Sequence, residues 1–245
     1  MRFALITAGA ILSGGTWAHA AVINVNPIAD TYVSSQNQTT VQNTSVSGVA
    51  TFVANNGDGT SNLRWAYLRF DIAAALAANS QTFADVTGIK LTLTSTQTSA
   101  LVENVYGLPA ANDTWVETTL TMNNDPNKIT DGTSKLVFNT AKAYNTAALA
   151  TWTARATAGA ENAFDVTSGP VFDFINADAD KVFTFVVAAN RNVGGGGVAW
   201  ASREASSGAP VLTLTTVPEP GTVGLLGAAA AGLLMRRRPA AAPRA

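Results

Sequence analysis

Residues 90–96 read KLTLTST, and their leucines and threonines alternate strictly. Successive side chains of a β-strand point to opposite faces of a sheet, so Leu91 and Leu93 share one face while Thr92 and Thr94 share the other. This alternation of apolar and hydroxyl-bearing residues indicates an antiparallel strand with one buried and one solvated face.

The same period of two recurs in residues 66–72 (AYLRFDI), 181–188 (KVFTFVVA) and 210–216 (PVLTLTT). Clusters of Gly, Asn and Asp punctuate such runs, as in NNGDGTSN at 55–62 and GGGG at 194–197. About ten short strands fit this pattern. It predicts an all-β fold, an antiparallel β-sandwich with jelly-roll-like connections.

Two stretches are expected to be short helices. Residues 72–79 (IAAALAAN) follow a predicted strand directly. Residues 167–178 (TSGPVFDFINAD) begin with capping residues and Pro170, then place Val171, Phe172 and Ile175 at helical spacing.

The N-terminus has the features of a secretory signal peptide over residues 1–20. Arg2 is a basic start, residues 3–12 are mainly apolar, and Ala18-His19-Ala20 supplies a small-x-small cleavage site. Cleavage is therefore expected between Ala20 and Ala21, which makes this an exported protein.

The C-terminus, residues 217–245, has the features of an address rather than of a folded domain. Pro218, Glu219 and Pro220 precede an uncharged stretch at 221–235, and Arg236, Arg237 and Arg238 follow. Such a helix would rise about 22 Å, short of a bilayer core of about 30 Å. It is expected to insert transiently as a short transmembrane helix, with the arginines on the cytoplasmic side.

An ordinary permanent membrane anchor is the alternative interpretation of this C-terminus. The order Pro-Glu-Pro, apolar helix, arginine cluster also closely resembles the PEP-CTERM sorting signal. That resemblance implies recognition by an exosortase, removal of the tail and export to the cell surface or extracellular matrix. The expected organisation is a signal peptide (1–20), a β-sandwich domain (21–216) and a sorting signal (217–245).

Composition excludes several classes of catalytic site from the mature chain. The protein has no cysteine, and its single histidine, His19, lies in the signal peptide. Disulfides, Ser-His-Asp and Cys-His catalysis and His-ligated zinc are therefore unavailable. Removing both end segments changes the formal net charge from −1 to −5, which argues against nucleic acid as a partner.

The mature chain also resembles the DNRLRE family along its whole length. The resemblance is carried, in order, by ADTYVSS (29–35), YLRFDI (67–72), VTGIKLTL (86–93), DTWVETTLTMNNDP (113–126), FDVT (164–167), FTFVV (183–187), ASRE (201–204) and PVLTLT (210–215). It implies a β-sandwich that acts as a carbohydrate-binding module, with acidic glycans such as alginate among the reported ligands. Met122 departs from the family, where a tryptophan is expected, and no catalytic domain accompanies the module.

The first candidate sugar-binding surface lies on one predicted strand. If Leu68, Phe70 and Ile72 point inward, then Trp65, Tyr67 and Arg69 share the opposite face with Asp71. Two aromatic rings beside an arginine would suit a polysaccharide. Alternatively, a loop covers this face, and Arg69 pairs with Asp71.

The remaining tryptophans also have competing interpretations. Trp152 with Arg155 forms a second aromatic–basic pair that either binds sugar or anchors a loop. Trp115 and Trp200 are expected in the core, and Arg203 and Glu204 are expected to form a structural ion pair.

Calcium is the one cofactor that the sequence leaves open. Asn56 and Asp58 offer oxygen ligands in a glycine-rich loop, and Asp178 with Asp180 forms another weak pair. Turn chemistry explains both without a metal.

These features predict a non-catalytic protein that binds extracellular polysaccharide after processing by signal peptidase and exosortase. The alternative is a purely structural surface or biofilm protein without a glycan site. A glycan-active enzyme has less support, because no motif sets two carboxylates across an aromatic trough.

Overall fold

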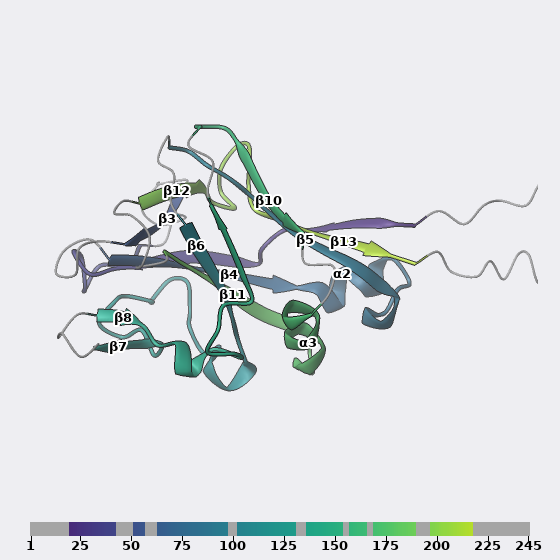
Figure 1. The fold of residues 1–245 in the computed structure, drawn as a ribbon, viewed down its shortest axis with the longest axis horizontal. Helices are drawn as coiled ribbons and strands as arrows, with labels where there is room; N and C mark the ends of the chain where they lie inside the picture. Colours follow the sequence, from purple (N-terminus) through teal and green to yellow (C-terminus); the bar gives the residue numbers. More distant parts are fainter. Residues whose placement is uncertain are drawn as a thin grey trace, which may run out of the picture. The chain divides into compact units, whose positions relative to one another are not determined.

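The chain folds into two main antiparallel β-sheets (Figure 1). The rows of leucine and phenylalanine side chains that the alternation predicted are buried in the core, which confirms the all-β sandwich. The computed structural model describes residues 20–42, 51–56, 63–97, 102–130, 136–153, 157–165, 169–189 and 197–217. Within these ranges, Val22–Thr216 forms one compact unit. The sorting signal from Pro218 onward and the signal peptide up to His19 lie outside the described residues.

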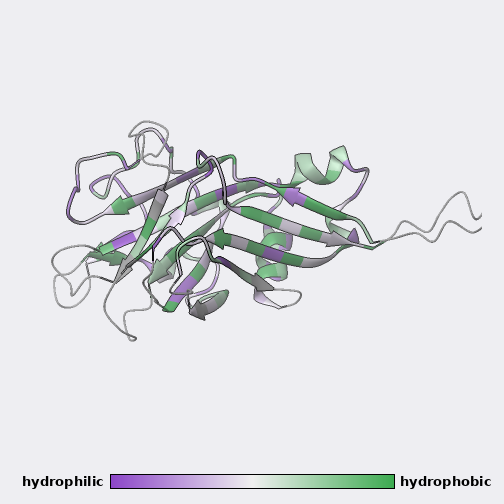
Figure 2. Cartoon of the chain, turned by 90° about the horizontal axis from the view of Figure 1, so that it is seen from above, coloured by the Kyte–Doolittle hydropathy of each residue, from purple (hydrophilic) through white to green (hydrophobic). Residues whose placement is uncertain are grey.

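The first sheet has the strand order β1-β13-β5-β10. Its strands are β1 (Val22–Val25), β13 (Val211–Thr216), β5 (Val86–Thr94) and β10 (Glu161–Asp165). Leu91 and Leu93 on β5 are fully buried, as are Leu212 and Leu214 on β13. The threonines between them lie on the outer face, and Figure 2 shows this alternation along the strands.

The second sheet has the strand order β12-β3-β4-β11-β6-β9, and β2 also pairs with β4. These strands are β12 (Gly197–Ala201), β3 (Thr51–Asn56), β4 (Leu63–Asp71), β11 (Val182–Ala189), β6 (Val102–Leu108), β9 (Ala150–Thr153) and β2 (Ala29–Ser34). Phe183, Phe185 and Val187 of β11 point into the core between the sheets.

The pair β3–β12 crosses from the second sheet to the first. β3 joins β4 only through Asn55–Arg64 and Asn56–Leu63. At the other side, the Thr96 backbone N–H donates to the Ala199 carbonyl at 2.8 Å, and Ser95 bridges Trp200. The two strands therefore close one side of the sandwich.

Both predicted helices are present at nearly the predicted positions. α2 (Ile72–Ala78) begins after Asp71, whose carboxylate accepts the Ala74 N–H at 3.0 Å. α3 (Pro170–Ala177) begins with a proline and buries Val171, Phe174 and Ile175, whereas Phe172 is only partly buried. Neither helix has the length and apolarity that crossing a membrane requires, and no other helix in the described ranges has them.

A long segment between β6 and β9 covers the outer face of the second sheet. It contains the single turns η2 (Ala110–Asn112) and η3 (Thr140–Lys142) and the short pair β7 (Lys128–Thr130) and β8 (Leu136–Phe138). A third single turn, η1 (Phe83–Asp85), precedes β5. The described ranges hold thirteen strands rather than about ten, because strands of three or four residues are too short to show a period of two.

Candidate functional site

The predicted sugar-binding face of β4 is buried. Trp65, Tyr67 and Arg69 do share one face, as the alternation predicted, but Trp65 is 2% exposed and Tyr67 is 0% exposed. Both rings belong to a second core that also contains Trp115, Leu120, Met122 and Phe138 of the covering segment. The expectation of an exposed aromatic surface is therefore wrong, and the alternative of a loop-covered face is correct.

One carboxylate of the covering segment binds both aromatic side chains. Asp125 Oδ2 accepts the Trp65 indole N–H at 2.9 Å, and its Oδ1 accepts the Tyr67 hydroxyl at 2.8 Å. The Asn127 backbone N–H donates to the same Oδ1 at 2.7 Å. Burial raises the pKa of Asp125, and these hydrogen bonds oppose the rise. The polar atoms of Trp65 and Tyr67 thus hold the segment in place.

Arg69 and Trp115 form the second attachment of the covering segment. The Arg69 guanidinium lies 4.4 Å from the centre of the Trp115 ring and forms an ion pair with Asp113. The alternative interpretation of the sequence, which paired Arg69 with Asp71, is therefore wrong on this point. The Trp115 indole N–H donates to Thr184 Oγ1 at 2.9 Å. Trp115 is 2% exposed, which confirms its predicted place in the core.

The second predicted aromatic–basic pair is placed only in part. Trp152 lies in β9, where its Cα pairs with that of Glu103 on β6, and its side chain is outside what the structure describes. Arg155 lies outside the described residues altogether. The sugar-binding role of this pair stays a prediction, and its position is an edge strand of the second sheet.

The calcium candidates in the glycine-rich loop have a similar outcome. Asn56 ends β3 with its side chain not described, and Asp58 lies outside the described residues. Calcium binding there stays a prediction.

Arg203 contacts three carboxylates, two of which come from distant parts of the chain. Its backbone N–H donates to Asp30 Oδ2 at 2.7 Å, its Nη2 contacts Glu117 Oε2 at 3.0 Å, and its Nε contacts Glu204 Oε1 at 2.7 Å. The predicted Arg203–Glu204 ion pair is confirmed. No sequence pattern links Asp30 and Glu117 to this cluster, since they are 173 and 86 residues away from Arg203 in the chain.

The electrostatics of this cluster depend on burial. Asp30 is fully buried, and desolvation raises its pKa to about 7. Burial also raises the pKa of Glu117, while the Arg203 charge opposes the rise. One oxygen from each of Asp30, Glu117 and Glu204 lies within 4.8 Å of the others, a spacing that a cation could use. The guanidinium of Arg203 already supplies positive charge there, so the arrangement serves as an ion-pair network.

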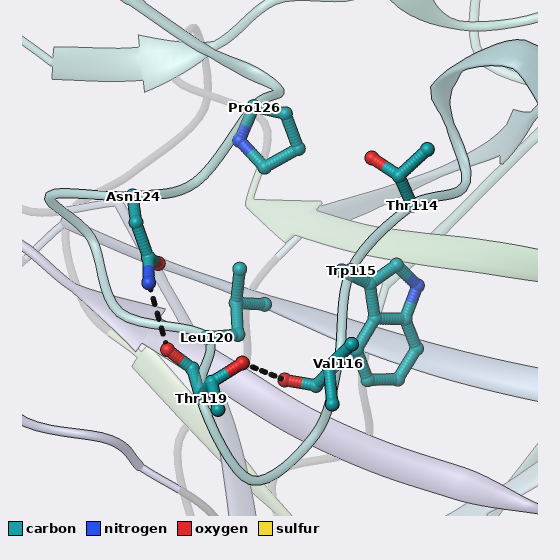
Figure 3. Close-up of a pocket in the computed structure, with 7 residues that line it drawn as sticks. All are labelled: Thr114, Trp115, Val116, Thr119, Leu120, Asn124 and Pro126. Atoms are coloured by element: carbon teal, nitrogen blue, oxygen red, sulfur yellow. Dashed lines mark hydrogen bonds between the residues drawn. The ribbon is translucent and has the colours of Figure 1, made fainter.

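A shallow pocket of about 200 Å³ opens in the covering segment (Figure 3). Figure 3 shows Leu120 between Asn124 and Thr119 on one side and Thr114 and Trp115 on the other. Val116 and Pro126 complete the lining. No sequence pattern marks this pocket apart from the family resemblance of residues 113–126, which contain its lining.

Trp200 and Glu103 form a buried pair near the β3–β12 crossing. Trp200 is fully buried, as predicted, and its indole N–H lies 3.3 Å from Glu103 Oε1. Glu103 is also fully buried, and desolvation raises its pKa well above the ordinary value. No sequence pattern distinguished this carboxyl from the exposed acidic residues.

The processing site at the N-terminus is accessible. Ala20 and Ala21 are both exposed immediately before β1. Cleavage between them stays a prediction, consistent with this exposure.

Two protein-family models match the chain. Carbohydrate-binding module family 96 matches residues 21–146, and the PEP-CTERM protein-sorting motif matches residues 216–238. No curated protein matches the sequence. The first match spans 126 of the 245 residues, slightly more than half of the chain. The sorting motif marks the chain for export and surface sorting, with membrane anchorage before processing. The chain therefore belongs to carbohydrate-binding module family 96 and carries a C-terminal PEP-CTERM sorting motif.

Proposed function

We propose that this protein binds extracellular polysaccharide without cleaving it and helps retain polysaccharide in the surface matrix. The observation that carries the proposal is the family match over residues 21–146 in a chain that is sorted to the surface. The sorting motif also supports processing by an exosortase, after which the folded unit Val22–Thr216 acts outside the cell.

The chemistry of the described carboxylates supports a binding role rather than catalysis. Glycosidases use two carboxyl groups separated by about 5 to 9.5 Å, with room for a sugar bond between them. The clustered carboxylates Asp30, Glu117 and Glu204 all contact Arg203, which makes them members of an ion-pair network. With no histidine or cysteine in residues 21–216, catalysis that depends on an imidazole or a thiol is also unavailable there.

A structural role without a glycan site is the second candidate, and one observation favours it. Three of the four tryptophans in residues 21–216, Trp65, Trp115 and Trp200, are buried. Because sugar binders stack exposed aromatic rings on sugars, Trp152 becomes the tryptophan that separates the two candidates.

A glycan screen tests the proposal directly. Residues 21–217 would be assayed against neutral and uronic-acid polysaccharides, with and without calcium. Saturable binding to one class is the expected result. No binding to any of them by a folded protein would overturn the proposal in favour of the structural role.

Paired variants then locate the binding surface. Trp152→Ala with Arg155→Ala tests the predicted aromatic–basic pair, and Lys90→Ala on the outer face of the first sheet controls for a general loss of positive charge. Trp65→Ala is a poor test, because loss of a buried ring destabilises the fold by about 3–5 kcal/mol.

A further inference from the structure

Both ends of the folded unit leave the sandwich at the same place. β1 starts at Val22 and β13 ends at Thr216, and the two strands pair side by side, with Val22 opposite Thr215. Figure 1 shows the start of β1 and the end of β13 next to each other, near α2. Val86, the first residue of β5, pairs with Thr216 there. We call this the terminal end of the sandwich, and a membrane segment attached to either strand holds the protein by it.

The connection from the terminal end to the membrane is short. The sorting motif, residues 216–238, anchors the chain in the membrane before processing. Its uncharged stretch begins at Gly221, five residues after the last residue of β13, Thr216. Five fully extended residues span at most about 18 Å. While the tail is in place, the terminal end therefore stays close to the membrane surface.

The tryptophan that separates the two candidate functions lies at the opposite end. β5 runs from Val86 at the terminal end to Thr94, a rise of about 26 Å. The next residue of the chain bridges Trp200, whose indole N–H lies 3.3 Å from Glu103 Oε1. The Cα of Glu103 pairs with that of Trp152 on β9. Trp152 therefore belongs to the end of the sandwich remote from both termini, which we call the distal end.

The two ends also differ in charge. Arg64 lies at the distal end, where β4 pairs with the end of β3, and among the described residues it has no carboxylate partner. The terminal end carries the carboxylates of Asp71, Asp85 and Asp180 together with Lys181. Such an arrangement directs an anionic polymer to the distal end and gives the terminal end no attraction of its own for anionic lipids. The tail alone then holds the terminal end at the membrane.

We propose that the sandwich stands on the membrane by its terminal end until the tail is removed, so that the distal end faces outward and binds polysaccharide in the anchored precursor. The binding part of this inference rests on the proposed function, whereas the orientation rests on the strand pairing and the short connection. Removal of the tail then releases a protein that already binds polysaccharide, rather than activating it.

Fluorescence quenching in membranes tests the orientation. The protein has no cysteine, so Ala84→Cys at the terminal end and Gln97→Cys at the distal end, both exposed positions, each introduce a single site for a fluorescent label. Residues 21–245 would be reconstituted into phosphatidylcholine vesicles that carry a nitroxide on the lipid headgroup. We expect the fluorescence to be lost at residue 84 and retained at residue 97. Equal quenching at both positions, or stronger quenching at residue 97, would overturn the inference.

Two matched controls show whether the short connection causes the difference. Residues 21–217 with the same labels lack the tail and should show no quenching. Quenching of this shortened protein would contradict the inference, because the terminal end would then remain on the membrane after the tail is removed. A Gly/Ser insertion of about 20 residues after Val217 extends the reach to about 25 Å and should weaken the quenching at residue 84. If Ala84→Cys fails to fold, Thr87→Cys, exposed on β5 beside Val86, takes its place.

Polysaccharide binding by the same vesicles separates this inference from the proposed function. Vesicles that carry residues 21–245 should bind the polysaccharide identified for residues 21–217, with the same affinity. If the soluble protein binds and the anchored precursor does not, the binding surface faces the membrane, which overturns the inference and keeps the proposed function. If the orientation is as expected but neither form binds any polysaccharide, the proposed function fails, and with it the binding part of the inference.

Discussion

At the scale of single residues, Asp125 shows why an apparent surface face becomes a core. Trp and Tyr carry a polar group that needs a partner when the ring is buried. Asp125 provides one acceptor for Trp65 and another for Tyr67. The two aromatic side chains that the sequence offered as a sugar platform are therefore satisfied from within the protein.

Because of these hydrogen bonds, we expect the isosteric substitution Asp125→Asn to destabilise the folded protein. Asp125 accepts hydrogen bonds from the Trp65 indole N–H and the Tyr67 hydroxyl. In Asp125→Asn, the side-chain amide N–H₂ faces one of these donors, so a buried polar group is left unpaired. We expect the free energy of unfolding to fall by about 1–3 kcal/mol, measured by urea denaturation. Asp173→Asn, on the exposed face of α3, should change it by less than about 0.5 kcal/mol. Equal effects of the two substitutions would show that the network contributes nothing.

At the scale of elements, the sequence predicted strands and helices, which depend on local patterns. It did not predict the contacts between residues that are far apart in the chain. Alternation in residues 66–72, 90–96, 181–188 and 210–216 identified four strands, and Pro170 marked the start of the second helix. The same alternation could not say which face of β4 would be covered. That depends on Asp113 and Asp125, which lie 44 and 60 residues from their partners Arg69 and Trp65.

The contact between β6 and α3 gives the second prediction. A Cβ atom at Gly107 would lie 2.6 Å from the Phe174 ring, so strand and helix pack closely only because glycine has no side chain there. We expect Gly107→Ala to reduce the free energy of unfolding by about 1–3 kcal/mol through overpacking.

Gly88→Ala on β5 is the matched control, since its Cβ would meet only Thr215 on the outer face, at 3.3 Å. It should be distinctly milder in the same thermal or urea denaturation experiment. A Gly107→Ala protein as stable as Gly88→Ala would mean that α3 shifts freely on the sheet.

At the scale of the whole molecule, buried carboxyl groups link stability to pH. Burial raises the pKa of Asp30, Glu103, Glu117 and Asp125. A raised pKa means that the folded state holds a proton that the unfolded state releases, so folding is favoured at low pH. For Asp30, this contribution is complete below its ordinary value of 3.8 and is lost as the pH rises through about 7.

We therefore expect the protein to be more stable at pH 5 than at pH 8, with Asp30 accounting for about 2–3 kcal/mol of the difference. Urea denaturation of the wild type and of Asp30→Asn at both pH values measures that share. The variant should gain stability relative to the wild type at pH 8 and have a flatter pH profile. A parallel profile in the two proteins would show that Asp30 titrates normally.

The extent of the folding unit gives the last prediction, because the family match and the sheets end at different places. The match stops at residue 146, whereas β13 lies between β1 and β5, and β11 lies between β4 and β6. Without residues 147–216, each sheet would lose a strand from its interior and expose two rows of unpaired backbone groups. We expect residues 21–146 alone to be unfolded or aggregated by circular dichroism and gel filtration, and residues 21–217 to unfold in one cooperative transition. A soluble, cooperatively folded 21–146 fragment would instead require the matched strands to pair with one another in a different order.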